Sequence, residues 1–242
     1  MSYIFREHIK QSLAVIAFLL TLTACTSESY DAGDGPNSYL TADLVLLHTS
    51  QDKSVRSALL DDGTTLQFSN PFAQDWLTRP DSVYRALLYY DKTVAASDAA
   101  ASNPTATSIV RARSVSPVSV LRPVEAEDME TLRTDPVGFE SIWLSKNKSY
   151  INLSLLLKSG KTEADDALHA LGIVSHGTTT DADRRRTLHL TLYHDQGGVP
   201  AYYTVQQYVS IPTQLLEKAD TVELTLNTYN GKKVVKVAVS NL

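Results

Sequence analysis

The sequence predicts an all-β protein in which two β domains follow an N-terminal export signal. Three observations support this fold class. Short runs of strand-forming residues are separated by turn signals, of which Asp62-Gly63 and Asn230-Gly231 stand out. The run from Tyr150 to Leu157 alternates in polarity, as a half-buried strand does. With 43% hydrophobic residues, the chain also has enough apolar material to build packed cores.

Residues 1–24 have the layout of a secretory signal peptide. Arg6 and Lys10 precede an apolar run from Leu13 to Leu22. At about 1.5 Å per residue this run covers about 15 Å, which is about half of a hydrocarbon core of about 30 Å. We therefore expect a removable signal and not a membrane-spanning helix.

The only cysteine, Cys25, follows the apolar run directly. The sequence Leu22-Thr23-Ala24-Cys25 resembles the lipobox of bacterial lipoproteins. That resemblance implies cleavage before Cys25, a diacylglycerol on its thiol and a further acyl chain on its amino group. Two or more acyl chains give stable anchoring, so the prediction is a lipid anchor at Cys25 in the outer membrane, on its periplasmic or its outer face. The alternative is an ordinary signal peptide with a coincidental cysteine.

Charge and cysteine content exclude several classes of function. The chain has a net charge of −5, and residues 1–24 carry Arg6, Lys10 and Glu7, a net +1, so the mature chain carries −6. A mildly acidic body argues against nucleic acid as the main partner. Because no second cysteine exists, no intramolecular disulfide can form. No cofactor is predicted.

The first β domain is expected at 38–122, after a flexible tether at 25–37 that is rich in polar residues and glycine. Five short strands without a long amphipathic helix favour a small barrel, and the five-stranded oligonucleotide/oligosaccharide-binding (OB) barrel fits best. The expected strands are Tyr39–Thr49, Val55–Leu60, Thr64–Phe68, Val83–Tyr90 and Ile109–Val115.

An antiparallel β-sandwich is expected at 136–242, after an acidic linker at 123–135. Its predicted strands are Ser141–Leu144, Tyr150–Leu157, Thr187–His194, Tyr202–Val209, Asp220–Tyr229 and Lys232–Val239. Two polar insertions interrupt the pattern, at 95–107 and 161–186. We expect the second to be a mobile loop, with a short helix near its start as a further possibility.

The ordered motifs along the chain resemble the NigD-like lipoproteins of Gram-negative bacteria. Besides the lipobox, they are Leu60–Leu66 (LDDGTTL), Asp135-Pro136-Val137 before Ile142-Trp143, Tyr150–Leu153 (YINL) and Leu226–Gly231 (LNTYNG). The resemblance implies an OB-like domain followed by a β-sandwich. It also implies an association with bacteriocin operons, and hence an immunity-like role as an alternative function. Both insertions are longer than the family pattern.

Residues that could carry chemistry do not form a recognisable catalytic set. His189 and His194 lie five apart on one predicted strand, so their side chains point to opposite faces, and no metal site is predicted. The acidic cluster of Glu125, Glu127, Asp128 and Glu130 could supply paired carboxylates to an enzyme that acts on envelope polysaccharide, but a solvated linker explains it better. The chain is therefore predicted not to be an enzyme.

Four tyrosines form the predicted binding surface. Tyr202 and Tyr208 share the polar face of one strand, and Tyr193 and Tyr229 are expected as cross-strand neighbours. Tyrosines on a sheet can stack on sugars or anchor a protein partner, although cross-strand aromatic pairs also simply stabilise sheets. The prediction is a membrane-anchored, non-enzymatic binding protein of the cell envelope, with a glycan or an envelope protein as its partner.

Overall fold

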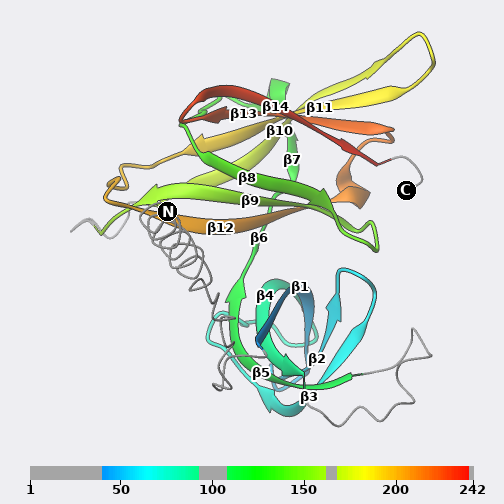
Figure 1. The fold of residues 1–242 in the computed structure, drawn as a ribbon, viewed down its shortest axis with the longest axis vertical. Coiled ribbons are helices and arrows are strands. Elements are labelled where there is room, and N and C mark those ends of the chain that lie inside the picture. The colour runs from blue at the N-terminus through cyan, green and yellow to red at the C-terminus, as the bar shows by residue number, and fades with distance from the viewer. Residues whose placement is uncertain (1–39, 93–107, 162–167, 240–242) are drawn as a thin grey trace, which may run out of the picture. The chain divides into compact units, whose positions relative to one another are not determined.

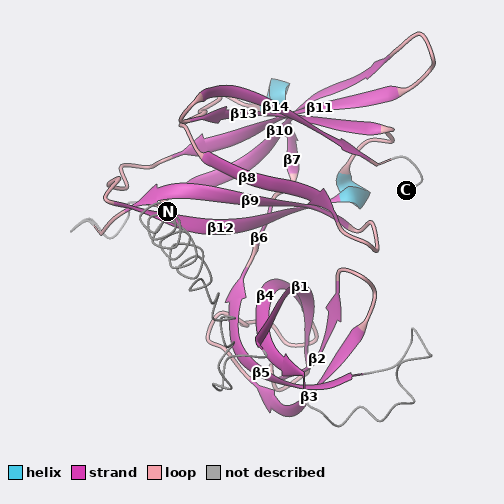
Figure 2. Ribbon diagram, viewed as in Figure 1, coloured by secondary structure: helices cyan, strands magenta, loops and turns pink. Residues whose placement is uncertain are grey.

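The computed structural model describes residues 40–92, 108–161 and 168–239. In these residues the regular structure is β-strand, apart from two single-turn 3-10 helices, η3 (Ala126–Asp128) and η4 (Thr213–Leu215) (Figure 2). The all-β prediction is thus confirmed. The predicted signal peptide, the tether, the lipidation site Cys25 and the insertion at 95–107 lie outside the described residues.

The N-terminal domain is a closed five-stranded barrel (Figure 1). Its strands are β1 (Leu40–Thr49), β2 (Val55–Leu60), β3 (Thr65–Phe72), β4 (Val83–Lys92) and β5 (Ser108–Pro117). They follow the order β1-β2-β3-β5-β4, and β4 returns to pair with β1. The only parallel pairing among these described strands joins β3 to β5. The predicted OB-like barrel is confirmed.

Alternation along the barrel strands supplies the barrel core. Val45, Leu47, Ala58, Ala86 and Leu88 are completely buried inside it. The Asp62-Gly63 turn joins β2 to β3, and Gly63 has a φ of +90°, a conformation that side-chain-bearing residues rarely adopt. The hairpin predicted at this turn is therefore present.

The C-terminal domain is a β-sandwich of two sheets (Figure 1). One sheet has the order β14-β13-β11-β10-β7 and the other has the order β6-β12-β9-β8. The strands are β6 (Ser119–Val120), β7 (Pro123–Glu125), β8 (Gly138–Leu144), β9 (Tyr150–Ser159), β10 (Ala170–Thr180), β11 (Arg186–Asp195), β12 (Tyr203–Pro212), β13 (Thr221–Thr228) and β14 (Gly231–Ala238).

The core of the sandwich uses the alternation seen in the sequence. Along β9 the apolar residues Ile151, Leu153, Leu155 and Leu157 are fully buried, and β11 and β13 contribute leucines from the facing sheet. The sandwich is mixed and not purely antiparallel, because β7–β10, β11–β13 and β6–β12 are parallel pairs. After β11 the chain crosses to the other sheet, where it forms β12. It then crosses back and forms β13 beside β11, and the two strands run in the same direction.

Two segments differ from the sequence-based expectation. The predicted linker at 123–135 begins with β7, which is an edge strand of the sandwich. Residues 170–180 of the predicted mobile insertion form β10, which pairs with β11 except at residues 176–177. A bulge between Ser175 and Thr178, where Gly177 has a φ of +79°, interrupts the alternation of β10 and hides this strand from sequence periodicity.

Within the described residues, no helix combines the length and the apolar character needed to cross a membrane.

Candidate binding cleft

A buried arginine joins the barrel to the sandwich. Arg85 of β4 is only 5% exposed, and its guanidinium holds Asp61 with two hydrogen bonds, Nη1–Oδ1 at 2.6 Å and Nη2–Oδ2 at 2.7 Å. Asp61 lies in the turn after β2, so this ion pair belongs to the barrel. Its paired geometry is the strongest one available to a carboxylate and a guanidinium.

The sandwich supplies the remaining partners of this arginine. Arg85 Nη2 donates to Asn152 Oδ1 at 3.0 Å, and Arg85 Nε donates to Ser210 Oγ at 3.1 Å. Asn152 Nδ2 donates to Asp61 at 2.8 Å, and Ser210 Oγ donates to Asn152 at 2.7 Å. The guanidinium also lies 4.3 Å from the centre of the Tyr150 ring. Barrel and sandwich thus share one hydrogen-bonded network, which fixes their contact.

Backbone hydrogen bonds support the same junction. Asn147 N, in the turn between β8 and β9, donates to Asp61 O at 2.7 Å. Val118 N donates to Arg85 O at 3.0 Å, and Leu121 N donates to Ser210 O at 2.9 Å, where the chain passes from the barrel into the sandwich. Residues on both sides of the junction are therefore held in place relative to one another.

A cleft of about 340 Å³ opens beside this network. Its walls come from β1, β4 and the β2–β3 turn of the barrel, and from β8, β12 and the turn after β8 in the sandwich. The lining residues are Ala42, Asp43, Leu44, Leu60, Asp61, Asp62, Leu87, Tyr89, Trp143, Leu144, Ser145, Lys146 and Tyr208. Apolar walls with a few convergent polar groups are typical of ligand sites.

Three aromatic side chains line the cleft. Tyr89 belongs to the barrel, and Trp143 and Tyr208 belong to the sandwich. The rings of Trp143 and Tyr208 meet edge to face, with centroids 6.4 Å apart and planes at 82°. They lie diagonally across β9, because Asn152 pairs with Trp143 and Ser154 pairs with Tyr208. The register of β8, β9 and β12 therefore places these two rings next to each other.

The charged groups of the cleft differ in their environments. The pKa of Asp62 lies below its usual value, chiefly because Thr64 N donates to its carboxylate at 2.9 Å, and the positive charge of Lys146 acts in the same direction. Asp43 accepts a hydrogen bond from the Tyr90 hydroxyl at 2.9 Å. Burial, together with this carboxylate, raises the pKa of Tyr90. Because the pKa of its carboxyl group is lowered, Asp62 keeps its negative charge at neutral pH.

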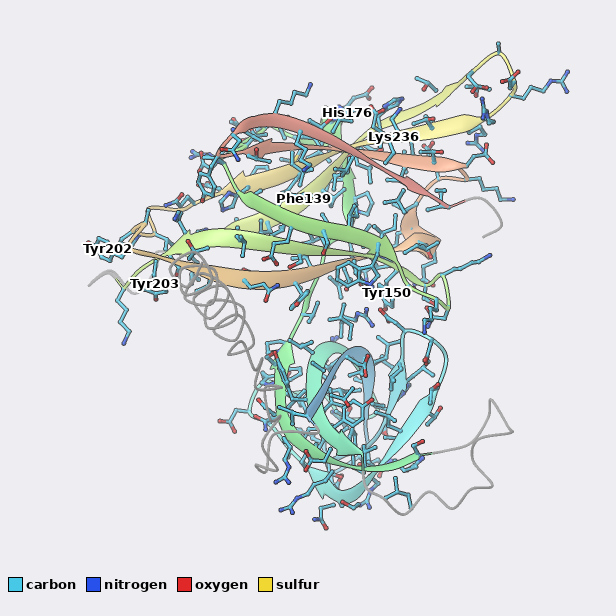
Figure 3. The ribbon with its side chains drawn as sticks, viewed as in Figure 1. Phe139, Tyr150, His176, Tyr202, Tyr203 and Lys236 are labelled. Atoms are coloured by element: carbon cyan, nitrogen blue, oxygen red, sulfur yellow. The ribbon has the colours of Figure 1, made fainter. Side chains whose placement is uncertain are left out.

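The structure separates the four tyrosines of the predicted surface. Tyr208 lines the cleft, whereas Tyr202 is 78% exposed and precedes β12 at the other end of the sheet from Tyr150 (Figure 3). Tyr193 on β11 and Tyr229 after β13 belong to the other sheet, which contains β14, β13, β11, β10 and β7. The four residues thus do not share one sheet face, and a binding role for Tyr202, Tyr193 and Tyr229 stays a prediction.

Three of the four described histidines of the sandwich, His169, His189 and His194, lie in two separate places. His169 Nδ1 is 3.0 Å from His194 Nε2, and His194 Nδ1 donates to Asp135 O at 2.9 Å. His189 contacts Glu223 at 3.1 Å on the other face of β11. Among the residues that the structure describes, no three metal-ligating side chains come together.

Comparison with known proteins assigns the C-terminal domain. Residues 120–239 match the family model of the NigD-like C-terminal beta sandwich domain. The chain belongs to the NigD-like family. Trp143, Lys146 and Tyr208 of the cleft lie inside this NigD-like domain, whereas the barrel contributes Asp43, Asp62 and Tyr89 from the residues before it.

Solved structures share the fold of this NigD-like protein. A NigD-like immunity protein from Bacteroides caccae is 23% identical, with a TM-score of 0.59, over 81% of this chain and 91% of that one. A lipoprotein candidate from Bacteroides fragilis is 14% identical, with a TM-score of 0.58, over 83% and 98%. A candidate toxin-related protein from Parabacteroides distasonis is 20% identical, with a TM-score of 0.53, over 82% and 92%. No curated protein matches the sequence.

Sequence reasoning missed the junction. Arg85 is noticeable in the sequence as the single charge in an apolar strand, and the Asp61-Asp62 pair as part of a turn. The hydrogen bonds of Arg85 to Asn152 and Ser210 join residues that are 67 and 125 positions apart in the chain, respectively. Trp143 offered no signal beyond its motif, because its role depends on strands that meet only in the folded sandwich.

Proposed function

We propose that this NigD-like protein is a non-enzymatic binding protein of the cell envelope, anchored in the outer membrane by lipid on Cys25. The cleft at the junction of barrel and sandwich is its ligand site. One observation carries the proposal: aromatic and charged side chains from two domains converge on a single cleft beside a buried hydrogen-bonded network.

The site has the properties that ligand binding requires. Its volume of about 340 Å³ falls in the range of small-molecule sites. The buried network around Arg85 holds its walls before any ligand arrives, so little ordering accompanies binding. A glycan fragment or a side chain of an envelope protein fits such a space.

Fractionation of cells tests the anchor. The proposal rests on the lipobox, and the similarity to a lipoprotein candidate supports it. We expect the wild-type protein in the membrane fraction and a Cys25→Ser variant in the soluble fraction. Retention of the variant in the membranes would refute lipid anchoring at this residue.

Affinity capture from envelope extracts tests the cleft. Mature protein carrying Cys25→Ser is immobilised, and the retained components are compared with those of Trp143→Ala and Tyr208→Ala. The matched control is Tyr202→Ala, which removes an exposed tyrosine of the same sheet outside the cleft. We expect both cleft variants, but not the control, to lose the retained component. Equal retention by all variants would argue against this site.

A second function is protection against a bacteriocin. The similarity to a NigD-like immunity protein and to a candidate toxin-related protein favours it. In this case the bound partner is the toxin or its receptor. A deletion strain is expected to become more sensitive to bacteriocins of neighbouring strains, and unchanged sensitivity across such a panel would contradict the immunity role.

A further inference from the structure

We infer that the cleft recognises an organic ammonium group, that is, a positively charged amine carried by its ligand. This inference rests on the proposed binding function and names the chemistry of the same site. Two features of the described lining support it, namely the arrangement of its aromatic rings and the balance of its charges.

The rings form a corner and not a flat platform. Because the planes of Trp143 and Tyr208 stand at 82°, one ring presents its face beside the edge of the other, and Tyr89 adds a third ring from the barrel. Aromatic faces attract cations through their quadrupole, and cages of several rings are the known receptors for ammonium groups. A neutral sugar, in contrast, stacks on a single open aromatic face.

The charges of the lining favour a cation. Arg85 neutralises Asp61 through two hydrogen bonds, so this carboxylate contributes little net charge. Asp43 and Asp62 then face a single basic side chain, Lys146, which leaves the lining with a net charge of −1. An anionic ligand would meet these carboxylates unfavourably, whereas an ammonium group would gain from them in a partly desolvated site.

Lys146 provides a test of whether the ligand is positively charged. It is exposed at the rim of the cleft and acts electrostatically on Asp62. A bound ammonium group would be repelled by this lysine, so its removal should strengthen binding. A neutral ligand that accepts hydrogen bonds from Lys146 would instead bind more weakly after the same change.

Fluorescence titration measures the binding directly. The chain has two tryptophans, and Trp76→Phe leaves Trp143 as the only one, so excitation at the red edge of tryptophan absorption reports on the cleft. Mature protein with Cys25→Ser is titrated with choline and with its neutral isostere 3,3-dimethyl-1-butanol, at constant chloride. A second pair is glucosamine and glucose. We expect each cation to bind at least about fivefold more tightly than its neutral counterpart.

Variants locate the effect. Asp62→Asn and Tyr208→Leu are expected to weaken choline binding by about threefold or more, and Lys146→Ala to strengthen it by about twofold. Tyr202→Leu, outside the cleft, should leave it unchanged. Circular dichroism verifies the fold of each variant, and if Trp76→Phe disturbs the barrel, calorimetry with both tryptophans present measures the same affinities.

The outcomes separate this inference from the proposed function. Equal binding of each cation and its neutral counterpart, or no binding of choline at all, overturns the ammonium inference. If the neutral sugar binds and calorimetry shows that Trp143→Ala abolishes that binding, the cleft remains the ligand site with a different ligand. If Trp143→Ala also leaves capture from envelope extracts unchanged, the proposed site itself fails.

Discussion

Removing Asp61 should destabilise the junction strongly. In Asp61→Ala the guanidinium of Arg85, which has a side-chain exposure of 1%, loses both of its charged hydrogen bonds. The acceptors that remain are neutral, namely Asn152 Oδ1 and Ser210 Oγ. Breaking a buried ion pair by deleting one partner costs about 3–5 kcal/mol. Asp61 itself is 19% exposed, so we expect the lower end of this range, about 3 kcal/mol.

Urea denaturation followed by circular dichroism and by tryptophan fluorescence measures this cost. The matched control is Arg56→Ala, which breaks an ion pair whose two side chains are 62% and 63% exposed, and it should cause no resolvable change. The double variant Asp61→Ala/Arg85→Met should be more stable than Asp61→Ala alone, because no uncompensated charge remains buried. A loss for Asp61→Ala no larger than that of the control would refute the structural role assigned to the network.

Two further predictions concern the sandwich. Burial, and secondarily the neighbouring His194, lower the pKa of His169 below its usual 6.5, so the unfolded chain binds protons first as the pH falls. The free energy of unfolding should therefore decrease as the pH is lowered through about 6.5, and it should decrease less in His169→Gln. Thermal melts at a series of pH values measure this, and identical pH profiles for the wild type and the variant would contradict it. Gly177→Ala places a side chain at a φ of +79° and should cost about 1–2 kcal/mol. Gly172→Ala, with ordinary contacts to Tyr193, is the control, and equal losses in thermal unfolding would show that the bulge conformation is not required.

Sequence patterns predicted the parts of the fold that depend on local residues. The Gly63 and Gly231 turns and the alternation along β9 are set by neighbouring residues, so the hairpins and the buried leucines followed from them. The strand β10 was missed because Gly172 and Gly177 resemble loop residues, and because the bulge shifts its alternation. The strand β7 has only three residues, which are too few to show an alternation of polar and apolar side chains.

The candidate site could be predicted only in part, since alternation assigns a residue to a face but not to a sheet. Tyr193 and Tyr208 both lie on partly exposed strand faces, yet they belong to different sheets of the sandwich. Contacts between the two domains, such as that between Arg85 and Asn152, depend on how complete domains dock. No local pattern encodes them.

Site-specific photo-crosslinking in cells tests the central claim most directly, because it asks where the ligand lies in the envelope. p-Benzoylphenylalanine replaces Tyr208 in the cleft or, as the control, the exposed Tyr202 of the same sheet. The proposed function predicts a crosslinked partner from position 208 that Trp143→Ala abolishes, and none from position 202. Crosslinking from position 202 alone, or from position 208 regardless of Trp143, would contradict the assignment of the cleft as the ligand site.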